Sequence, residues 1–495
     1  MKIVLQQAGI SFAGFAVGQL LRLILNLVIA RLLGAEELGI YALALSVMQI
    51  AEVAAVLGLD VLLLRAVNSR PGDGKAPVEV IASALKMSLL VSAAVSAVLV
   101  LFAGTLSGVF EAGPLLDMTL TCYALSLPFH VLVAVGGHAL QAMRELGPKN
   151  VASQILIPGG MIVLTGAVFL AGGREEALLV PMPVAAFVAA VWMGWRLAVR
   201  TGIHPLTVLG APLETGALRS SLPLMLVALA GMVSHWLDIL MLGWLQGPST
   251  AGLYQPAVRS AGIIRSFLLA FAAIAAPLFA SLHAQRRTEE LRHLLQAVTR
   301  WIAMTSVPFC VLLMVLPECV LAMFGDEFIS AAPVLVLLAA AVLLQAVTGL
   351  YDQVLQMGGR GGVSALNAVL ALGVHASLNM VLVPRYSLTG AAAAVAVVYL
   401  FLAVLRGGQV LVFWRMHLFS KSLFKPLAAG ALSGLAAFAL RPFAGMLPAG
   451  LFLAVGFVVI LAVYLPIIRL MKLEREDVEV ILELFPQAKK FVRVT

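Results

Sequence analysis

Charged residues are scarce in this chain. Asp, Glu, Lys and Arg together make up 11% of its 495 residues, whereas an ordinary soluble domain contains roughly 25%. Long polar stretches are missing too, so the sequence leaves no room for a soluble catalytic domain between its apolar segments. No Cys, His and Asp form a recognisable nucleophile arrangement. These shortages argue against an enzyme.

Cysteine is rare as well. The three cysteines, Cys122, Cys310 and Cys319, lie in or beside apolar segments and lack the spacing of metal ligands. Cysteines in such surroundings behave as small hydrophobic residues. We therefore predict neither a disulfide framework nor a metal site.

Apolar residues, by contrast, make up 62% of the chain, and its mean hydropathy is +1.05. Apolar runs of 18 or more residues follow one another, and each is long enough to cross about 30 Å of hydrocarbon. We predict fourteen spans, near residues 8–32, 38–64, 79–103, 114–141, 150–171, 177–197, 221–245, 250–280, 299–323, 330–356, 362–384, 388–411, 423–441 and 448–470. The expected fold is an all-α polytopic membrane protein.

The basic residues predict the orientation. With the N-terminus in the cytoplasm, the cytoplasmic loops contain Arg65, Arg70, Lys75, Arg144, Lys149, Arg196, Arg200, Arg219, Arg286, Arg287, Arg292, Arg360, Arg415, Lys421 and Lys425. The opposite side has only Arg31, Arg174, Arg385 and Arg441. Such an excess on one side places both termini in the cytoplasm. The net charge of +8 follows from this topology, and we predict no binding of nucleic acid.

Parts of the chain repeat after about 213 residues. The equivalent positions are Gly34, Gly39 and Tyr41 with Gly247, Gly252 and Tyr254, Leu140-Gln141 with Leu355-Gln356, and Asn150 with Asn367. The repeat shifts the pattern by six spans, an even number, so both halves have the same orientation. A pseudo-two-fold axis along the membrane normal, with a cavity on it, is the expected result.

The repeat predicts four regions. They are an N-terminal bundle of helices 1 to 6 at 1–218, a C-terminal bundle of helices 7 to 12 at 219–418, two extra helices at 419–471, and an amphipathic cytoplasmic tail at 472–495. The last two regions have no counterpart in the repeat.

Several motifs resemble a known family. They are ARLLGAEELGIYALALSVMQIAEVAAVLGLDVLLLR, the turns LQAMRELGPKN and LQMGGRGG, and SLNMVLVPRYSLTGAAAAVAV. In their order and spacing they resemble the polysaccharide-transporter branch of the multidrug/oligosaccharidyl-lipid/polysaccharide exporter superfamily, which includes O-antigen and exopolysaccharide flippases. The resemblance covers helices 1 to 12, and the fourteen spans also fit it.

The resemblance implies a flippase for cell-surface polysaccharide synthesis in the bacterial inner membrane. Such a protein moves a polyprenyl-diphosphate-linked oligosaccharide from the cytoplasmic to the outer leaflet by alternating access. Its partners would be this substrate, membrane lipids, and the polysaccharide polymerase and chain-length machinery. No cofactor is implied, and either Na+ or H+ can be the coupling ion.

Charged side chains inside the spans are the first candidates for function, because an ionised group at bilayer depth is costly unless it faces water, a partner or a substrate. Arg22 lies in the middle of the first span, and Arg259 and Arg265 lie in the eighth. The offset of 213 relates Arg265 to Glu52 in the second span and Arg22 to His235 in the seventh. Equivalent positions of both halves are thus polar, as a shared cavity requires.

Substrate binding is the role that we predict for these five residues. A guanidinium group is always charged and binds phosphate oxygens through two parallel hydrogen bonds. The three arginines can therefore bind the diphosphate or acidic sugars. A structural role is the alternative: Arg22 and Arg259 can pair with Glu52 or Asp238, and His235 can be a packing residue.

Asp238 is the candidate for cation coupling. It lies one helical turn from His235, and relatives that include lipid II flippases and drug antiporters use acids in these helices. His375 and Asn379 share one face of helix 11 at a spacing of four, so Asn379 can join Asp238 at a sodium site. No second acid accompanies Asn379, and proton exchange at Asp238 or pairing with an arginine remains an alternative.

Two more acids lie near the cytoplasmic ends of helices 2 and 10. Asp60 and Asp352 are close in sequence to Arg65 and Arg360. We predict interfacial ion pairs or gates at these two places.

Two other functions remain open. A cation-coupled drug or metabolite antiporter of the same superfamily would have the same bundle but a more acidic or aromatic cavity. A membrane-embedded glycan-modifying enzyme would need a catalytic His and acid at the membrane surface, whereas the pair of His235 and Asp238 lies deep in a span.

Overall fold

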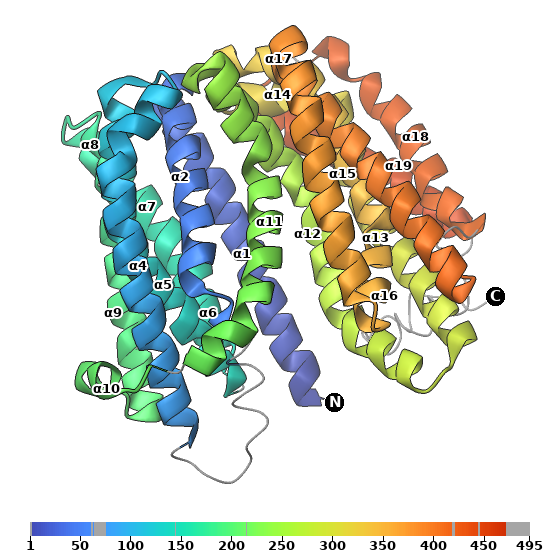
Figure 1. Cartoon of the computed structure of the whole chain (residues 1–495). Coiled ribbons are helices and arrows are strands. Elements are labelled where there is room, and N and C mark those ends of the chain that lie inside the picture. Colours follow the sequence, from blue (N-terminus) through green and yellow to red (C-terminus); the bar gives the residue numbers. More distant parts are fainter. Residues whose placement is uncertain are drawn as a thin grey trace. The chain divides into compact units, whose positions relative to one another are not determined.

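In the computed structural model every regular element that is described is a helix, which confirms the predicted class. The structure describes residues 2–60, 63, 76–143, 145–213, 215–417, 421–443 and 446–471. Figure 1 shows the helices in chain order. The predicted tail at 472–495 lies outside the described residues.

Two compact units make up the chain. The first unit contains Met1–Pro256 and Ala368–Ala391, and the second contains Ala257–Asn367 and Ala392–Thr495. These units follow packing and not the boundaries of the repeat, so the predicted division at residues 218 and 418 stays a prediction.

The first unit contains most of the N-terminal helices. Its elements are α1 (Lys2–Leu32), α2 (Ala35–Val56), α4 (Ala76–Val109), α5 (Gly113–Ala142), α6 (Gly147–Asn150), the π-helix η1 (Val151–Leu156), α7 (Ile157–Leu170), α8 (Glu176–Leu179), α9 (Pro181–Thr201), α10 (Pro205–Gly210) and α11 (Thr215–Gln246), with the start of α12 (Pro248–Ala284). The middle of α17 (Gly361–Trp414) also belongs to it.

The second unit contains the remaining parts of α12 and α17. Its other elements are α13 (Thr288–Val315), α14 (Pro317–Ala322), the 3-10 helix η2 (Asp326–Ala331), α15 (Ala332–Thr348), α16 (Leu350–Met357), the 3-10 helix η3 (Lys421–Leu423), α18 (Phe424–Phe438), the 3-10 helix η4 (Arg441–Phe443) and α19 (Ala449–Leu470). Helix α18 packs on both α13 and α19, which joins the two helices without a repeat counterpart to this unit.

Twelve helices in the described part are long and apolar enough to cross a membrane. The number of these helices is lower than the fourteen predicted spans for two reasons. The 54-residue helix α17 covers two predicted spans and is broken at Ser387, where φ is 49° and ψ is −127°. Helix α18, at the predicted span 423–441, has only 15 residues.

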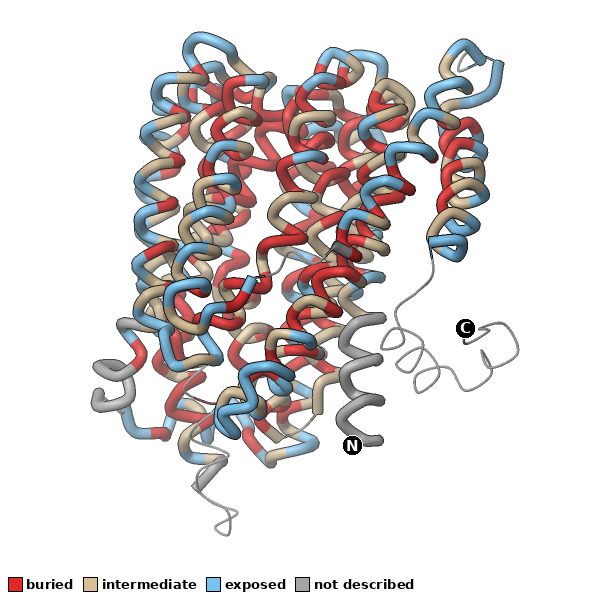
Figure 2. Tube along the Cα trace, turned by 90° about the vertical axis from the view of Figure 1, so that its right-hand side faces the viewer, coloured by how far each residue is buried: buried red, intermediate tan, exposed pale blue. Residues whose placement is uncertain are grey.

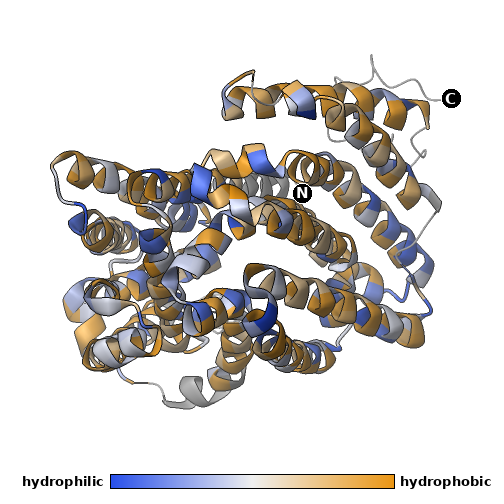
Figure 3. Ribbon diagram, turned by 90° about the horizontal axis from the view of Figure 1, so that it is seen from above, coloured by the Kyte–Doolittle hydropathy of each residue, from blue (hydrophilic) through white to orange (hydrophobic). Residues whose placement is uncertain are grey.

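The outer faces of these helices are hydrophobic. Leu101, Leu170 and Val412 are large apolar residues that stay exposed, and Figure 2 shows exposed turns along the long helices. Figure 3 shows that hydrophobic residues predominate on them. In water such a surface would aggregate, whereas acyl chains cover it without cost. The chain is therefore a multi-pass membrane protein.

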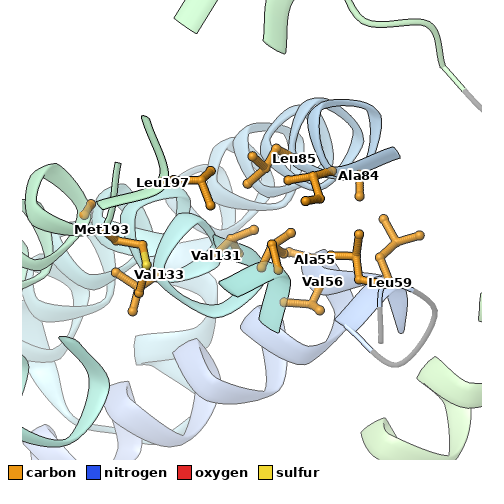
Figure 4. Close-up of a cluster of buried hydrophobic side chains, with 14 of the residues drawn as sticks. Ala55, Val56, Leu59, Ala84, Leu85, Val131, Val133, Met193 and Leu197 are labelled. Atoms are coloured by element: carbon orange, nitrogen blue, oxygen red, sulfur yellow. The ribbon is translucent and has the colours of Figure 1, made fainter. Parts of the chain in front are cut away.

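The core of the first unit lies where α2, α4, α5 and α9 pack side by side. Alanines lie there among the larger apolar residues, and small residues allow close approach of helix backbones in a membrane. Figure 4 labels Ala55, Val56, Leu59, Ala84, Leu85, Val131, Val133, Met193 and Leu197 of this cluster.

Two equivalent glycines of the repeat pack directly against each other. A Cβ added to Gly39 on α2 would collide with the carbonyl oxygen of Pro248, and one added to Gly252 on α12 would collide with that of Ala35. Pro248 is the repeat equivalent of Ala35, since both pairs are 213 residues apart. The contact is therefore reciprocal, as contacts at a two-fold axis are.

The turns of the repeat have the same hydrogen bonds. The backbone N–H groups of Met143 and Glu145 donate to the carbonyls of Ala139 and Leu140, at 3.2 and 2.9 Å. Those of Gly358 and Arg360, 215 residues later, donate to Val354 and Leu355, at 2.8 and 2.9 Å. The sequence echo is thus a structural repeat.

Replacing either crossing glycine by alanine should destabilise the protein. The added methyl of Gly39→Ala or Gly252→Ala meets backbone atoms that no rotamer change can move, and overpacking costs about 1–3 kcal/mol or more. We expect a lower melting temperature of the purified protein by fluorescence-detected size exclusion. Gly262→Ala on α12 is the matched control, because nothing lies within 4 Å of the added Cβ, and it should keep or raise stability. Equal behaviour of the three variants would contradict this close crossing.

Candidate functional site

Arg22 is held by two neutral side chains. Its Nη2 donates to Oε1 of Gln154 at 2.7 Å, and its Nη1 donates to Oε1 of Gln19 at 3.3 Å. The guanidinium is half-buried, in a helix long enough to span a membrane. No acid pairs with it among the described residues, so its positive charge lacks a counter-ion within that part of the protein.

Glycines on α1 make the contact with Gln154 possible. A Cβ on Gly18 would collide with the Gln154 side chain, and one on Gly14 would lie 3.1 Å from the Cβ of Asn150. This spacing of four residues lets the π-helix η1 approach α1 closely. Single π-helical turns are frequent at functional sites. Gln154 was not predicted from the sequence, where a polar residue in an apolar span was its only signal.

Glu52 and His235 lie on α2 and α11 of the same unit. Glu52 is half-buried, and no ion pair of its carboxylate is found in the described part of the chain. His235 is exposed, with its ring 5.2 Å from that of Trp236 in an edge-on arrangement. Trp236 is buried and donates from Nε1 to Oε1 of Gln49 at 3.1 Å.

Arg259 and Arg265 belong to the part of α12 in the second unit, and both are half-buried. Arg22, Glu52 and His235 belong to the first unit. The substrate-binding role of all five residues stays a prediction.

Asp238 and Asn379, the two residues predicted for cation coupling, are in contact. Nδ2 of Asn379 donates to Oδ1 of Asp238 at 3.1 Å and to the backbone carbonyl of His375 at 3.2 Å. Nε2 of His375 lies 2.7 Å from the same Oδ1. Asp238 is on α11 and the other two are on α17, so the predicted alternative of an arginine partner is not what the structure shows.

This cluster is buried and incompletely satisfied. The side chains of His375 and Asp238 are only 6% and 13% exposed, and Asn379 is fully buried. Oδ1 of Asn379 and both ring nitrogens of His375 have no hydrogen-bond partner among the residues that the structure describes, although Nε2 lies close to Asp238. Buried polar atoms without partners are costly. One carboxylate, one amide oxygen and one imidazole can exchange a proton or bind a small cation here.

Asp352, one of the two acids predicted as interfacial ion pairs or gates, has a partner other than the arginine near it in sequence. Asp352 accepts a hydrogen bond from Ser364 at 2.6 Å and pairs with Arg406 at 3.3 Å. Arg360, the expected partner, has its guanidinium 4.1 Å from the centre of the Phe413 ring. Asp352 therefore forms an ion pair as predicted, but its partner is Arg406 of α17 and not Arg360, which lies in the turn.

Asp60 lies 3.8 Å from Nε2 of His138. The expected partner, Arg65, lies outside the described residues. Nζ of Lys149 also lies within hydrogen-bond distance of His138. The polar cluster at this end of the first unit therefore contains the negative charge of Asp60 and the positive charge of Lys149.

Two family models match the chain. The one described as "Polysaccharide biosynthesis protein" matches residues 4–283, and the MatE model matches residues 223–381. Together these matches confirm the predicted resemblance.

A curated relative is the "Probable low-salt glycan biosynthesis flippase Agl15" of Haloferax volcanii. It is 24% identical over 369 residues, which cover 74% of this chain and 75% of that protein. Its name describes a flippase and not an enzyme, in agreement with the prediction for this chain.

Two solved structures show the same fold. Lipid II flippase MurJ in an inward closed conformation has a TM-score of 0.76 at 12% identity, covering 92% of this chain and 97% of that one. An inward-facing multidrug resistance transporter of the MATE family has a TM-score of 0.65 at 17% identity, covering 79% and 92%. At these identities the likeness shows the fold alone.

Replacing Asn379 by leucine should destabilise the protein. The change removes two hydrogen bonds at a fully buried position: the one to the Asp238 carboxylate is worth roughly 1.5–3 kcal/mol and the one to the backbone carbonyl roughly 0.5–1.5 kcal/mol. We expect a lower melting temperature for Asn379→Leu. Ser377→Ala on the same helix is the matched control, because Ser377 is exposed and bonds to the carbonyl of Gly373 within its own helix. An equal decrease of the melting temperature in both variants would contradict a stabilising role of the buried Asn379 amide.

Proposed function

The chain belongs to the polysaccharide biosynthesis protein family, and on that premise we propose that it is a flippase for a polyprenyl-diphosphate-linked oligosaccharide. The substrate would pass from the cytoplasmic to the outer leaflet by alternating access. Such transport supplies the sugar units for a cell-surface polysaccharide. The name of the Haloferax volcanii relative supports this proposal.

The uncompensated charge of Arg22 is the observation that carries the proposal. An arginine with a purely structural role in a membrane span is expected to pair with an acid, whereas the described partners of Arg22 are two glutamines. Amides fix the direction of the guanidinium without neutralising it. A guanidinium has five N–H donors, so donors remain for phosphate oxygens. A diphosphate headgroup supplies the missing negative charge.

The other four predicted residues take complementary parts in this proposal. Arg259 and Arg265 bind the diphosphate or acidic sugars, and His235 contributes a ring and a donor. Glu52 accepts hydrogen bonds from sugar hydroxyl groups, because it is an acid without a cationic partner in the described part of the chain.

Asp238 and Asn379 couple transport to a cation gradient in this proposal. Na+ prefers hard oxygen ligands, and the described cluster supplies only one carboxylate and one amide oxygen. His375 already places a nitrogen 2.7 Å from the carboxylate, and an imidazole nitrogen can donate or accept a proton but is not a hard oxygen ligand. We therefore favour H+ over Na+ as the coupling ion.

A cation-coupled drug antiporter is the second candidate. The MatE match over residues 223–381 favours it, because this region contains Asp238 and Asn379. The uncompensated charge of Arg22 opposes it, since a cationic drug would be repelled.

Location and partners complete the proposal. We place the protein in the plasma membrane, with both termini in the cytoplasm, as the excess of basic residues on one side indicates. The polysaccharide polymerase and chain-length machinery would use the translocated glycan.

Arg265→Ala should abolish transport without lowering the amount of folded protein. The alanine removes the charge that the diphosphate needs, whereas Arg265→Lys retains the charge without the paired geometry and should restore activity only in part. The measurement is leaflet-resolved accumulation of the lipid-linked glycan in cells, with a membrane-impermeant glycan probe.

Arg287→Ala serves as the control for the arginine variants, because Arg287 is exposed and forms a surface ion pair with Glu290. It should leave transport unchanged. A normal outer-leaflet signal in cells that lack the protein, together with reduced efflux of small cations, would support the antiporter instead.

Asp238→Asn should uncouple transport from the cation gradient. The amide keeps the size of the carboxylate but can neither take up a proton nor compensate a cation, so we expect at least a roughly tenfold loss of gradient-driven transport, the loss of one charge-assisted interaction. Vesicles with separately imposed pH and Na+ gradients provide the measurement. Stimulation of the wild type by the Na+ gradient alone would contradict proton coupling. Asp326→Asn, at an exposed position of η2, is the control.

A further inference from the structure

Four polar side chains form a clamp at one end of the first unit. Nζ of Lys149 on α6 donates to Oε1 of Gln141 on α5 at 2.9 Å and lies 2.9 Å from Nε2 of His138. Oδ2 of Asp60, which follows α2, lies 3.8 Å from the same Nε2. The His138 and Asp60 side chains are 19% and 28% exposed, so water reaches the clamp.

The neighbours of His138 fix its protonation state. Nδ1 lies 2.8 Å from the backbone carbonyl oxygen of Ala134, and a carbonyl only accepts, so Nδ1 carries a proton. Nε2 faces the ammonium group of Lys149, which only donates. Nε2 must therefore be the unprotonated acceptor, and the clamp requires a neutral imidazole.

A second proton would reverse this arrangement. Protonated Nε2 becomes a donor and a positive charge directly opposite the Lys149 ammonium, so the two groups repel each other. Asp60 is then the available partner for the imidazolium. Protonation of His138 thus exchanges a Lys149 contact for an Asp60 contact.

Lys149 is continuous with the segment that holds Arg22. It lies two residues before η1, the π-helix that contains Gln154, and Gln154 accepts the hydrogen bond from Arg22 at 2.7 Å. We propose that His138 is a proton switch, whose protonation releases Lys149 and loosens the π-helical segment that positions Arg22. In this proposal Gln154 is a positioning residue for Arg22.

Other charged groups on the elements around α5 are already engaged or lie away from His138. On α9, Arg196 and Arg200 both pair with Glu145, at 3.4 and 2.7 Å. On α4, Lys86 donates to the carbonyls of Leu209 and Ala211, at 2.8 and 2.7 Å.

The remaining acids on these elements are few. Glu79 is on α4, Glu36, Glu37 and Glu52 are on α2, Asp117 is near the start of α5, and Glu176 is on α8. Helix α8 contacts the first half of α5, where Tyr123 donates to the carbonyl of Leu178 at 3.5 Å. The π-helix η1 carries no titratable group. Lys149 and Asp60 are thus the two charges of the described elements that respond directly to His138.

The repeat provides an internal control without histidine. In the second unit Gln356, the equivalent of Gln141, donates to Ser364, which lies eight residues further along the chain as Lys149 does from Gln141, at 3.4 Å. Asp352 accepts from Gln356 at 2.9 Å and pairs with Arg406 at 3.3 Å. These four residues include no histidine.

Hydrogen–deuterium exchange of the purified full-length protein, without substrate, tests the switch. The backbone amides of residues 149–157 are followed between about pH 8 and about pH 4, a range that extends below that of an exposed histidine, with correction for intrinsic exchange rates. We expect roughly tenfold faster exchange at the acidic end, the effect of losing one hydrogen bond to a charged group. The amides of residues 358–367 should show no such step.

Two variants sharpen the test. His138→Gln keeps an acceptor for Lys149 but cannot titrate, so exchange should stay slow over the whole range. Lys149→Met lacks the clamp, so exchange should be fast at both ends. A step that persists in His138→Gln, or a wild type without a step, overturns the proposal.

The test is independent of the flippase proposal, because it uses no substrate. If the exchange step is present and glycan transport is absent, the result supports the His138 switch and contradicts the proposed flippase function. Glycan transport without the exchange step would support the flippase and overturn the switch.

Discussion

The cost of an uncompensated charge in hydrocarbon governs this structure. It explains why so few ionised groups lie in the spans. It also explains why each of them indicates either a specific partner side chain or a ligand. Asp238 lies against an imidazole and accepts a hydrogen bond from an amide, and Asp352 is bound by an arginine and a hydroxyl. Arg22 and Glu52 are exceptions, since the described partners of Arg22 are neutral and no ion pair of Glu52 is found in the described part of the chain. A membrane protein retains such an imbalance when a ligand can correct it.

Close helix approach is the second requirement, and glycine supplies it. Gly18 allows the Gln154 side chain to reach Arg22, while Gly39 and Gly252 allow α2 and α12 to cross at the repeat axis. Without hydrophobic driving force between helices in lipid, such contacts provide much of the association energy. The same residue type therefore serves the site and the scaffold.

The sequence predicts the parts that depend on local pattern. Apolar run length gives the spans, and constant offsets give the repeat, because both signals are contained in neighbouring residues. The contact of Asp238 with Asn379 could also be predicted, since helix spacing placed His375 and Asn379 on one face. The partner of Arg22 was not, because Gln154 becomes a neighbour only through the close approach at Gly18. Asp352 likewise pairs with Arg406, more than fifty residues away in sequence, and nearness in sequence favoured Arg360.

The reciprocal crossing of Gly39 and Gly252 has a genetic consequence. Each glycine faces the backbone carbonyl oxygen of a residue on the other helix, Pro248 or Ala35. A peptide carbonyl is common to every amino acid, so no change of side chain at either position can make room. Selection for revertants of a Gly39 variant should therefore recover glycine codons at position 39 and no compensating mutations at 248 or 35. The two halves of the duplicated chain can diverge almost everywhere else, but at this crossing the backbone of each half requires a glycine in the other.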